Sequence, residues 1–158
     1  MITIRNAMES DIKDIREIAI KTWHHTYKDL IPEQVQDQFL TRAYSDEILK
    51  NRIKESLFLV AKQEDNVVGF ANVFQQDQTA ELSAIYIYPE YQGNGIGTKL
   101  FNKIISLLDS TSKIFVDVEK GNQVGEEFYR SKGFQEVKEF EDNLFGHTFQ
   151  TKQLVFIL

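Results

Sequence analysis

The chain has 158 residues, of which 42% are hydrophobic and 27% are charged. These values are ordinary for a globular protein, and the length fits one domain over residues 1–158 with a sizeable core. The 24 acidic residues exceed the 18 basic ones, and the formal net charge is −6. This balance argues against nucleic acid as a partner, because phosphate backbones are bound by clustered Lys and Arg. An acidic surface favours cationic partners such as amines, although most acidic proteins are simply soluble.

The sequence contains no cysteine, which excludes disulfides, thiolate metal sites and a cysteine nucleophile together. The N-terminal segment becomes polar within a few residues, and no stretch approaches the ~20 apolar residues that span a bilayer. We therefore expect a soluble, cytoplasmic protein without a membrane partner. His24 and His25 are adjacent, hence about 100° apart on a helix, and His147 stands alone, so we expect no metal site.

The N-terminal third predicts a short strand followed by three helices. Residues 2–5 have the pattern of a strand. Ser10 is placed to cap a helix whose apolar residues recur at helical spacing as far as Trp23. Pro32 suits the first turn of a second helix, and Ser45 opens a third.

The hydrophobic period then changes to that of strands. Residues 57–74 predict a β-hairpin and residues 80–88 a third consecutive strand. A helix, a strand at 113–119 and a helix at 122–132 that ends at Gly133 follow. Two final strands, 134–140 and 151–158, are expected around a loop at 142–150. The order βααα-βββ-α-β-α-ββ indicates an α+β sandwich, in which a mixed sheet of about seven strands carries helices on both faces.

The stretch IYIYPEYQGNGIGTKLF, residues 85–101, places three glycines at alternate positions between a strand and a helix. The first amides of a helix lack internal acceptors, and the helix dipole favours an anion there by ~0.3–1 kcal/mol. Gly93, Gly95 and Gly97 therefore predict close contact with phosphates, with amides of residues 92–98 and the Thr98 hydroxyl as donors. The alternative is a tight turn with close packing of helix on sheet. The spacing fits neither the dinucleotide fingerprint nor the P-loop.

Two motifs together resemble the GNAT acetyltransferase superfamily. Residues 92–97 have the form Q/R-x-x-G-x-G/A after a strand that ends in Ile-Tyr-Pro, as in that family's acetyl-CoA pyrophosphate loop. Asn122 and Gly125, with Phe128-Tyr129 and then residues 132–134, are similar to the family's N-x-x-A-x-x-F-Y and G-F element, with glycine in place of the usual alanine. The order of elements also agrees over nearly the whole chain.

The resemblance implies acetyl-CoA as the cofactor and a sheet that splays between its fourth and fifth strands. The pantetheine arm is then expected to pair with the backbone of Ile85 and Ile87, and the pyrophosphate to lie on the 92–98 loop. The cofactor-binding residues that follow from the resemblance are Ile85, Tyr86, Ile87, Gln92, Gly93, Asn94, Gly95, Ile96, Gly97, Thr98, Asn122 and Tyr129.

Acetyl transfer to an amine needs a deprotonated nucleophile, a stabilised oxyanion and a protonated thiolate leaving group. Because the chain lacks cysteine, we expect direct attack in a ternary complex. An amine of pKa ~10.4 costs about 4–5 kcal/mol to deprotonate at pH 7. By resemblance Glu81 is the candidate base, with an ordinary solvent-facing strand residue as the alternative. Tyr129 is the candidate acid, with a core aromatic as the alternative. An amide near Ile85 or Ile87 is expected to hold the oxyanion, and Asn122 to cap its helix.

The acceptor is the open question. The stretch TWHHTYKDLIP resembles the first-helix region of bacterial small-substrate and polyamine-type members, which implies an acceptor wall of Trp23, His24, Tyr27 and Tyr44. Core packing is the alternative for Trp23. Run 136–142 is acidic and is interpreted as a solvated strand edge rather than an amine-binding patch. We expect acetylation of a primary amine of a small molecule, with a polyamine as the leading candidate. The alternatives are a protein N-terminus or lysine, or a non-catalytic acyl-CoA-binding module, and the chain is expected to be a monomer or homodimer.

Overall fold

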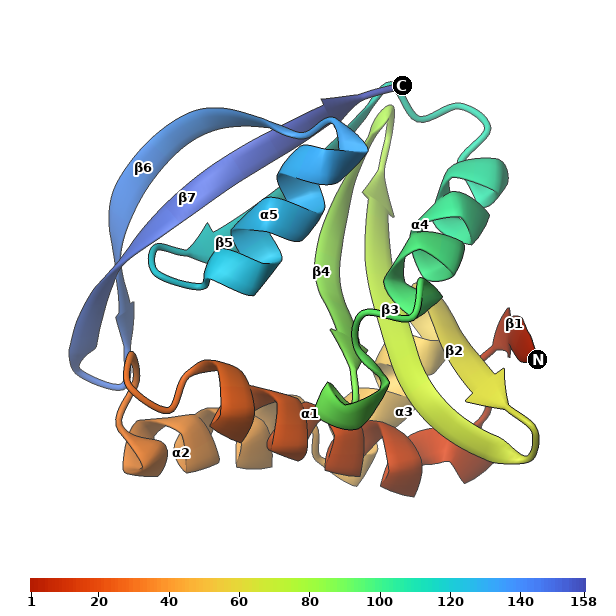
Figure 1. The fold of residues 1–158 in the computed structure, drawn as a ribbon, viewed down its shortest axis with the longest axis horizontal. Coiled ribbons are helices and arrows are strands. Elements are labelled where there is room, and N and C mark those ends of the chain that lie inside the picture. The colour runs from red at the N-terminus through yellow and green to blue at the C-terminus, as the bar shows by residue number, and fades with distance from the viewer.

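The computed structural model describes residues 1–158, which form a seven-stranded sheet with helices on both faces (Figure 1). The strands are β1 (Ile2–Asn6), β2 (Leu57–Gln63), β3 (Asn66–Gln76), β4 (Thr79–Ile87), β5 (Lys113–Glu119), β6 (Gln135–Leu144) and β7 (His147–Ile157). The helices are α1 (Ile12–Thr26), α2 (Glu33–Ala43), α3 (Asp46–Glu55), α4 (Ile96–Leu107) and α5 (Gln123–Lys132), with short 3₁₀ turns η1 (Glu9–Asp11) and η2 (Pro89–Tyr91). The predicted α+β class and element order are confirmed. None of these helices is both long enough and apolar enough to cross a membrane.

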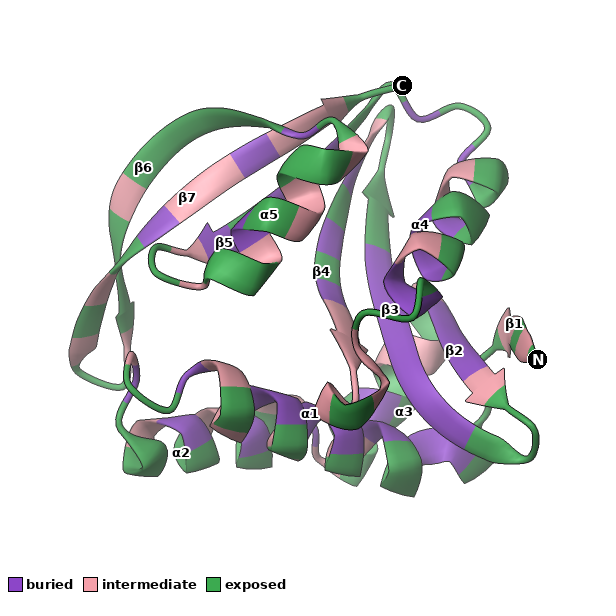
Figure 2. Ribbon diagram, in the orientation of Figure 1, coloured by how far each residue is buried: buried purple, intermediate pink, exposed green.

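The sheet separates two hydrophobic clusters. One lies under α4, where Leu100 and Ile104 are almost completely buried. The other lies under α1, α2 and α3. Strand β3 is buried without a break from Val67 to Val73, because helices cover both of its faces (Figure 2). A strand buried on both faces shows a nearly continuous apolar run rather than alternation. The sequence of β3 has such a run, interrupted only by Asn72, whose side chain is hydrogen-bonded to Arg52, Ser56 and Leu57.

Helix ends follow capping rules at three of the four predicted positions. The Ser45 hydroxyl accepts from the amide of Ile48, and the Asn122 carboxamide oxygen accepts from that of Gly125. Gly133 ends α5 in the left-handed conformation, at φ 105°. The prediction for Ser10 is wrong, since α1 begins at Ile12 and residues 9–11 form η1. Its neighbour Asp11 takes the local bonds instead, accepting from the Met8 amide at 2.8 Å.

The predicted loop at 142–150 is also wrong. β6 continues to Leu144 and β7 begins at His147, so a turn of only two residues joins them. Phe145 and Gly146 have φ angles of 49° and 87°, the left-handed pair that a tight hairpin turn requires. β6 is the outer strand of the sheet and is exposed along most of its length, so its sequence carries no alternating apolar signal.

Strands β4 and β5 form the only parallel pair, and they stay together for three residues. Their last paired residues are Glu81 and Phe115, although β4 runs on to Ile87 and β5 to Glu119. The two strands therefore diverge, as the expected splay between strands 4 and 5 requires. Tyr88 donates its amide to Val68 on β3, so by alternation the backbone groups of Ile85 and Ile87 point away from β3 and into the gap.

Candidate active site

A cavity of about 830 Å³ opens where β4 and β5 diverge. Its wall includes the glycine-rich loop, the far halves of β4 and β5, the start of α5, and side chains of α1, α2, β6 and β7. One continuous cavity thus joins the predicted phosphate loop to the helices that were expected to face the acceptor.

The loop before α4 offers a row of free donors. The backbone amides from Gly93 to Thr98 donate to no protein acceptor, and the first amide of α4 with a partner is that of Lys99, which donates to the Gly95 carbonyl at 3.1 Å. Free amides at the positive end of a helix form a site for an anion. These residues fit a diphosphate, as the sequence predicts.

Glycine is required at the three loop positions for different physical reasons. Gly93 and Gly95 have φ angles of 82° and 80°, and a Cβ on either would enter open space. They supply the left-handed turn and leave the amides accessible. Gly97 is a packing residue instead, because a Cβ there would lie 2.9 Å from a ring carbon of Phe128 on α5. Close packing was the alternative interpretation for this motif, and it accounts for Gly97.

Two side chains of the loop support its shape. Gln92 donates to the carbonyl of Ile87 at 3.1 Å, and Asn94 donates to that of Tyr91 at 3.2 Å. Asn94 does not line the cavity, whereas Gln92 does. Thr98 lines the cavity and accepts a hydrogen bond from Lys132 at 2.6 Å. The sequence argument missed Lys132, which lies 34 residues away at the end of α5.

The contact between Asn122 and Gly125 explains why this chain has glycine at the motif position where the family usually has alanine. The Asn122 side chain bends over the first turn of α5 and accepts from the Gly125 amide at 3.0 Å. A Cβ at Gly125 would lie 2.7 Å from the Asn122 amide nitrogen, so the cap in this conformation leaves no room for alanine. Asn122 also lines the cavity, which keeps its proposed contact with the cofactor open.

Tyr129 lies on α5 with its ring packed edge-on against Phe128 and Phe134, and it lines the cavity. Burial, reinforced by the nearby charge of Glu119, raises the pKa of the Tyr129 phenol well above its usual value. The hydroxyl therefore keeps its proton at physiological pH and can donate a hydrogen bond. The ring thus packs against aromatic neighbours, as the alternative interpretation has it, and also lines the cavity; its role as an acid stays a prediction.

Glu81 also lines the cavity, with an exposed side chain that makes no hydrogen bond or ion pair with the protein. It lies at the point where β4 and β5 part. On the opposite strand, Glu119 ends β5, lines the same cavity and is half-buried. The Tyr27 hydroxyl donates to it at 2.6 Å. Nothing in the local sequence distinguishes Glu119 from a surface residue at a strand end, and the sequence argument missed it.

Two of the four residues that were expected to form the acceptor wall, Trp23 and Tyr27, line the cavity. Trp23 and Tyr27 are buried and line the cavity, and the Trp23 indole stacks on Phe39 and donates to the Tyr86 hydroxyl at 3.0 Å. Tyr44 lies outside the cavity and packs in the core against Phe70. His24 also lies outside it, and its neighbour His25 lines the cavity instead, because adjacent helix residues point in different directions.

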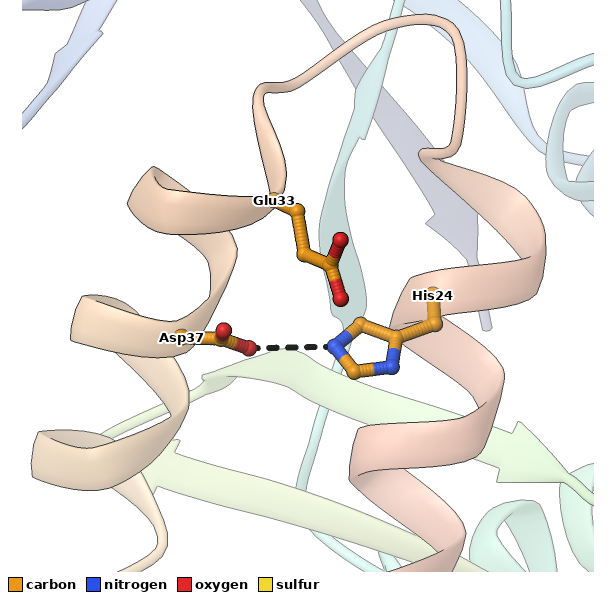
Figure 3. Close-up of side chains that lie close together, drawn as sticks. All are labelled: His24, Glu33 and Asp37. Carbon is orange, nitrogen blue, oxygen red and sulfur yellow. Dashed lines mark hydrogen bonds and ion pairs between the residues drawn. The ribbon is translucent and has the colours of Figure 1, made fainter.

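His24 belongs to a separate group on the outer surface of α1 and α2 (Figure 3). Its Nε2 lies 3.1 Å from a carboxylate oxygen of Asp37, and one ligand atom from each of His24, Glu33 and Asp37 lies within 4.8 Å of the others. The prediction from sequence weighed only the adjacent pair His24–His25. In the structure, the side chains that converge on His24 are Glu33 and Asp37, which come from a second helix, α2. The group consists of exposed side chains at a helix–helix contact and ties α1 to α2.

The charged side chains of the cavity are all acidic. Its lining contains four carboxylates, one histidine, and neither lysine nor arginine; the carboxylates are Glu81, Asp117, Glu119 and Asp142. None of the four forms an ion pair with a basic side chain of the protein. Desolvation, and then the charge of Asp142, raise the pKa of Asp117. Asp142 lies in the run that was interpreted as a strand edge, and it is at once on the edge strand and in the cavity.

Comparisons with known proteins agree with this arrangement. The chain matches the acetyltransferase (GNAT) family over residues 12–134 and belongs to it. It is 29% identical over 142 residues to the spermidine N(1)-acetyltransferase of Thermoplasma acidophilum, a match that covers 85% of this chain and 88% of the relative. It is 32% identical over 108 residues to the uncharacterized N-acetyltransferase YuaI of Bacillus subtilis, a match that covers 65% of this chain and 62% of that protein.

The crystal structure of PaiA N-acetyltransferase from Thermoplasma acidophilum in complex with coenzyme A has a TM-score of 0.90 to this chain. The two are 25% identical, and the match covers 100% of this chain and 99% of the other. The family, the open loop of amides and the diverging strands define the class as an acetyl-CoA-dependent N-acetyltransferase.

Proposed function

We propose that this protein transfers the acetyl group of acetyl-CoA to a primary amine of a small polycationic molecule, with a polyamine such as spermidine as the leading candidate. The observation that carries the proposal is the lining of the cavity, which contains four carboxylates and neither lysine nor arginine. The relative named a spermidine N(1)-acetyltransferase, 29% identical to this chain, supports the same substrate class.

Electrostatics favours a cation with more than one charge. The charge of Asp142 contributes to the raised pKa of Asp117, so the cavity holds like charges in unfavourable proximity. A bound ammonium group relieves that repulsion, and a second one relieves it further. An anionic acceptor is repelled. The ring of Phe39, which is partly exposed, lines the same cavity and suits the methylene chain of a polyamine.

The coenzyme is expected to bind along the gap. The free amides from Gly93 to Thr98 hold its diphosphate, and the backbone of Ile85 and Ile87 pairs with its pantetheine arm. A free amide on this edge of β4 is the proposed donor to the oxyanion that forms during transfer. The acetyl group supplied by the coenzyme is then placed between β4 and β5.

Tyr129 is proposed to stabilise the departing thiolate by donating a hydrogen bond. A phenol of pKa ~10 is a weaker acid than a thiol of pKa ~8.5, so complete proton transfer to the thiolate costs about 2 kcal/mol before burial is counted. Burial raises the pKa of Tyr129 further. The geometry therefore favours a charge-assisted hydrogen bond, which forms as negative charge develops on sulfur.

An acceptor panel tests the proposal. Thiol release and product mass are measured with spermidine, putrescine, butylamine, and peptides that carry a free N-terminus or a lysine. We expect kcat/KM for spermidine to exceed that for butylamine at least tenfold, because butylamine lacks a second ammonium group. Efficient turnover of peptides without turnover of polyamines would contradict the proposal in favour of a protein substrate.

Asp142→Asn sharpens the same test. Loss of one carboxylate should raise KM for spermidine about tenfold, since a charge-assisted hydrogen bond is worth ~1.5–3 kcal/mol. KM for butylamine should change much less. Asp65→Asn, in the turn between β2 and β3 and outside the cavity, is the matched control. Equal effects of Asp142→Asn on both amines would remove Asp142 from acceptor recognition.

A further inference from the structure

We infer that Glu119, positioned by the hydroxyl of Tyr27, takes the proton from the attacking ammonium group, in place of Glu81. The inference rests on the proposed function and names the base of that same site. Three independent observations carry it: the position of Glu119 along the diverging strands, its hydrogen bond, and the charges that surround it.

Strand register places Glu119 beside the reacting end of the cavity. β4 and β5 are parallel, and Glu81 is paired with Phe115. Glu119 lies four residues further along β5; on β4 the register against β3 shifts between Leu82 and Ala84, so the segment Ile85–Tyr86 lies at about the height of Glu119 on the other side of the gap. At ~3.3 Å per residue, Glu81 lies roughly 13 Å lower, at the closed end of the gap. Its side chain cannot cover that length.

The hydrogen bond gives Glu119 a fixed direction. Tyr27 follows the last turn of α1 and is only 5% exposed, and its hydroxyl lies 2.6 Å from Oε2 of Glu119. No other side chain donates to this carboxylate, and no basic group pairs with it. Oε2 is therefore held by a neutral phenol, whereas Oε1 has no side-chain partner and is the oxygen that we infer takes the proton. Glu81 has no such partner.

The surroundings of Glu119 contain neutral and negative groups. Besides Glu119, the titratable groups of the cavity lining are His25 of α1, Tyr27 just after it, Glu81 and Tyr86 of β4, Tyr91 of η2, Asp117 of β5, Tyr129 of α5 and Asp142 of β6. The positive charge that acts on Asp117 is Lys138 of β6, which does not line the cavity. Burial raises the pKa of Glu119, and the hydrogen bond from Tyr27 opposes that rise. A raised carboxyl pKa lies closer to the pKa of the ammonium group, which makes the carboxylate a better base for it.

The proton balance of the step is complete. An N–H bond of the ammonium group breaks, and its proton passes to Oε1 of Glu119. The nitrogen lone pair forms the C–N bond with the acetyl carbonyl carbon, and the C–S bond breaks with its electron pair on sulfur. The second proton lost by nitrogen ends on the thiolate, beside the Tyr129 hydroxyl. Glu119 returns its proton to solvent through the open cavity.

The experiment is the pH profile of kcat/KM for spermidine in wild type, Glu119→Gln, Glu81→Gln and Tyr27→Phe. In wild type, kcat/KM should fall as the pH is lowered, and the midpoint of this fall should lie above the pKa of an ordinary carboxyl group. Glu119→Gln should abolish this acid limb and lower kcat about a hundredfold or more, with the Kd for acetyl-CoA unchanged. Glu81→Gln should keep the acid limb. Glu127→Gln, on the exposed side of α5, is the matched control.

Tyr27→Phe separates positioning from packing. It removes the donor that favours the charged carboxylate, so the acid limb should move to higher pH while the ring still fills its place. A structural role alone would lower activity at all pH values without moving the limb. If Glu119→Gln fails to fold, as judged by circular dichroism, this shift decides the question.

Three results would overturn the inference. The first is an unchanged profile in Glu119→Gln, and the second is a profile that disappears in Glu81→Gln, which would make Glu81 the base. The third is an acid limb that stays in place in Tyr27→Phe. In all three cases the wild-type protein still acetylates spermidine, so the proposed function stands. A wild-type protein that binds acetyl-CoA but acetylates no amine would overturn the proposed function and this inference with it.

Discussion

Lys132 brings a positive charge to the glycine-rich loop before α4, residues 92–98, whose own side chains carry none. Its Nζ lies 2.6 Å from the Thr98 hydroxyl and 5.4 Å from the centre of the Phe128 ring. The lysine is partly buried, and its stem covers the contact between α5 and the start of α4. Near the free amides of the loop, this charge is placed to act on a diphosphate.

We therefore expect Lys132→Met to weaken acetyl-CoA binding about tenfold, with Lys132→Arg intermediate because it keeps the charge but not the compact ammonium group. Isothermal titration calorimetry at two salt concentrations measures this, and the salt dependence of binding should be smaller in Lys132→Met. Lys103→Met, on an exposed position of α4, is the control. Equal affinity in wild type and Lys132→Met would show that the amides alone hold the phosphates.

At the scale of single residues, the sequence predicts the loop well and the acceptor side poorly. The loop can be found from the spacing of its glycines, because glycine is required where the local backbone adopts a left-handed conformation. Glu119 and Tyr27 are 92 residues apart, and their contact exists only because α1 ends over the open face of β5. Tyrosine is a residue type that is common in binding pockets, but the ring of Tyr44 packs against Phe70 in the core. No local pattern contains that information.

Helix α5 shows how an element's start depends on a pair of side chains. Glycine in a helix costs roughly 0.5–1 kcal/mol relative to alanine, yet α5 has Gly125 in its first turn. The Asn122 cap fills the space that an alanine methyl group would need. Losing such a cap costs ~1 kcal/mol, which is about what the alanine would contribute.

The expected outcome for Gly125→Ala is a free energy of unfolding close to that of wild type, because gain and loss offset each other. In the Asn122→Ala background the same substitution should stabilise the protein by about 0.5–1 kcal/mol, since no cap remains to be displaced. Urea unfolding of the four proteins closes this double-mutant cycle. An identical gain in both backgrounds would mean that the cap and the methyl group do not compete.

The C-terminal hairpin is the element that sequence patterns describe least well. β6 pairs along its whole length with β7, but its side chains are mostly exposed, so hydrophobic periodicity ends before the strand does. The strands in the middle of the sheet were predicted closely because they are buried. A buried face requires apolar residues at regular intervals, which is the pattern that sequence analysis detects. An edge strand with both faces exposed to solvent has little of this pattern.

The acidic character of the whole molecule works in the same direction as the cavity. A net charge of −6 and four carboxylates in the cavity lining attract polycations over a distance set by ionic strength. KM for spermidine should accordingly rise with added salt while kcat changes little. Steady-state kinetics between low and physiological ionic strength measure this. KM for butylamine should respond less, and a KM for spermidine that is indifferent to salt would contradict the argument.

A carboxylate-lined cavity also governs what happens after the chemistry. Acetylation turns an ammonium group into a neutral amide, so the modified molecule carries one positive charge fewer than the one that entered. If the acceptor is the polyamine proposed above, the acid groups hold the product less firmly, and a fresh, more highly charged molecule displaces it. The same wall would then favour product release and disfavour a second acetylation of the same molecule.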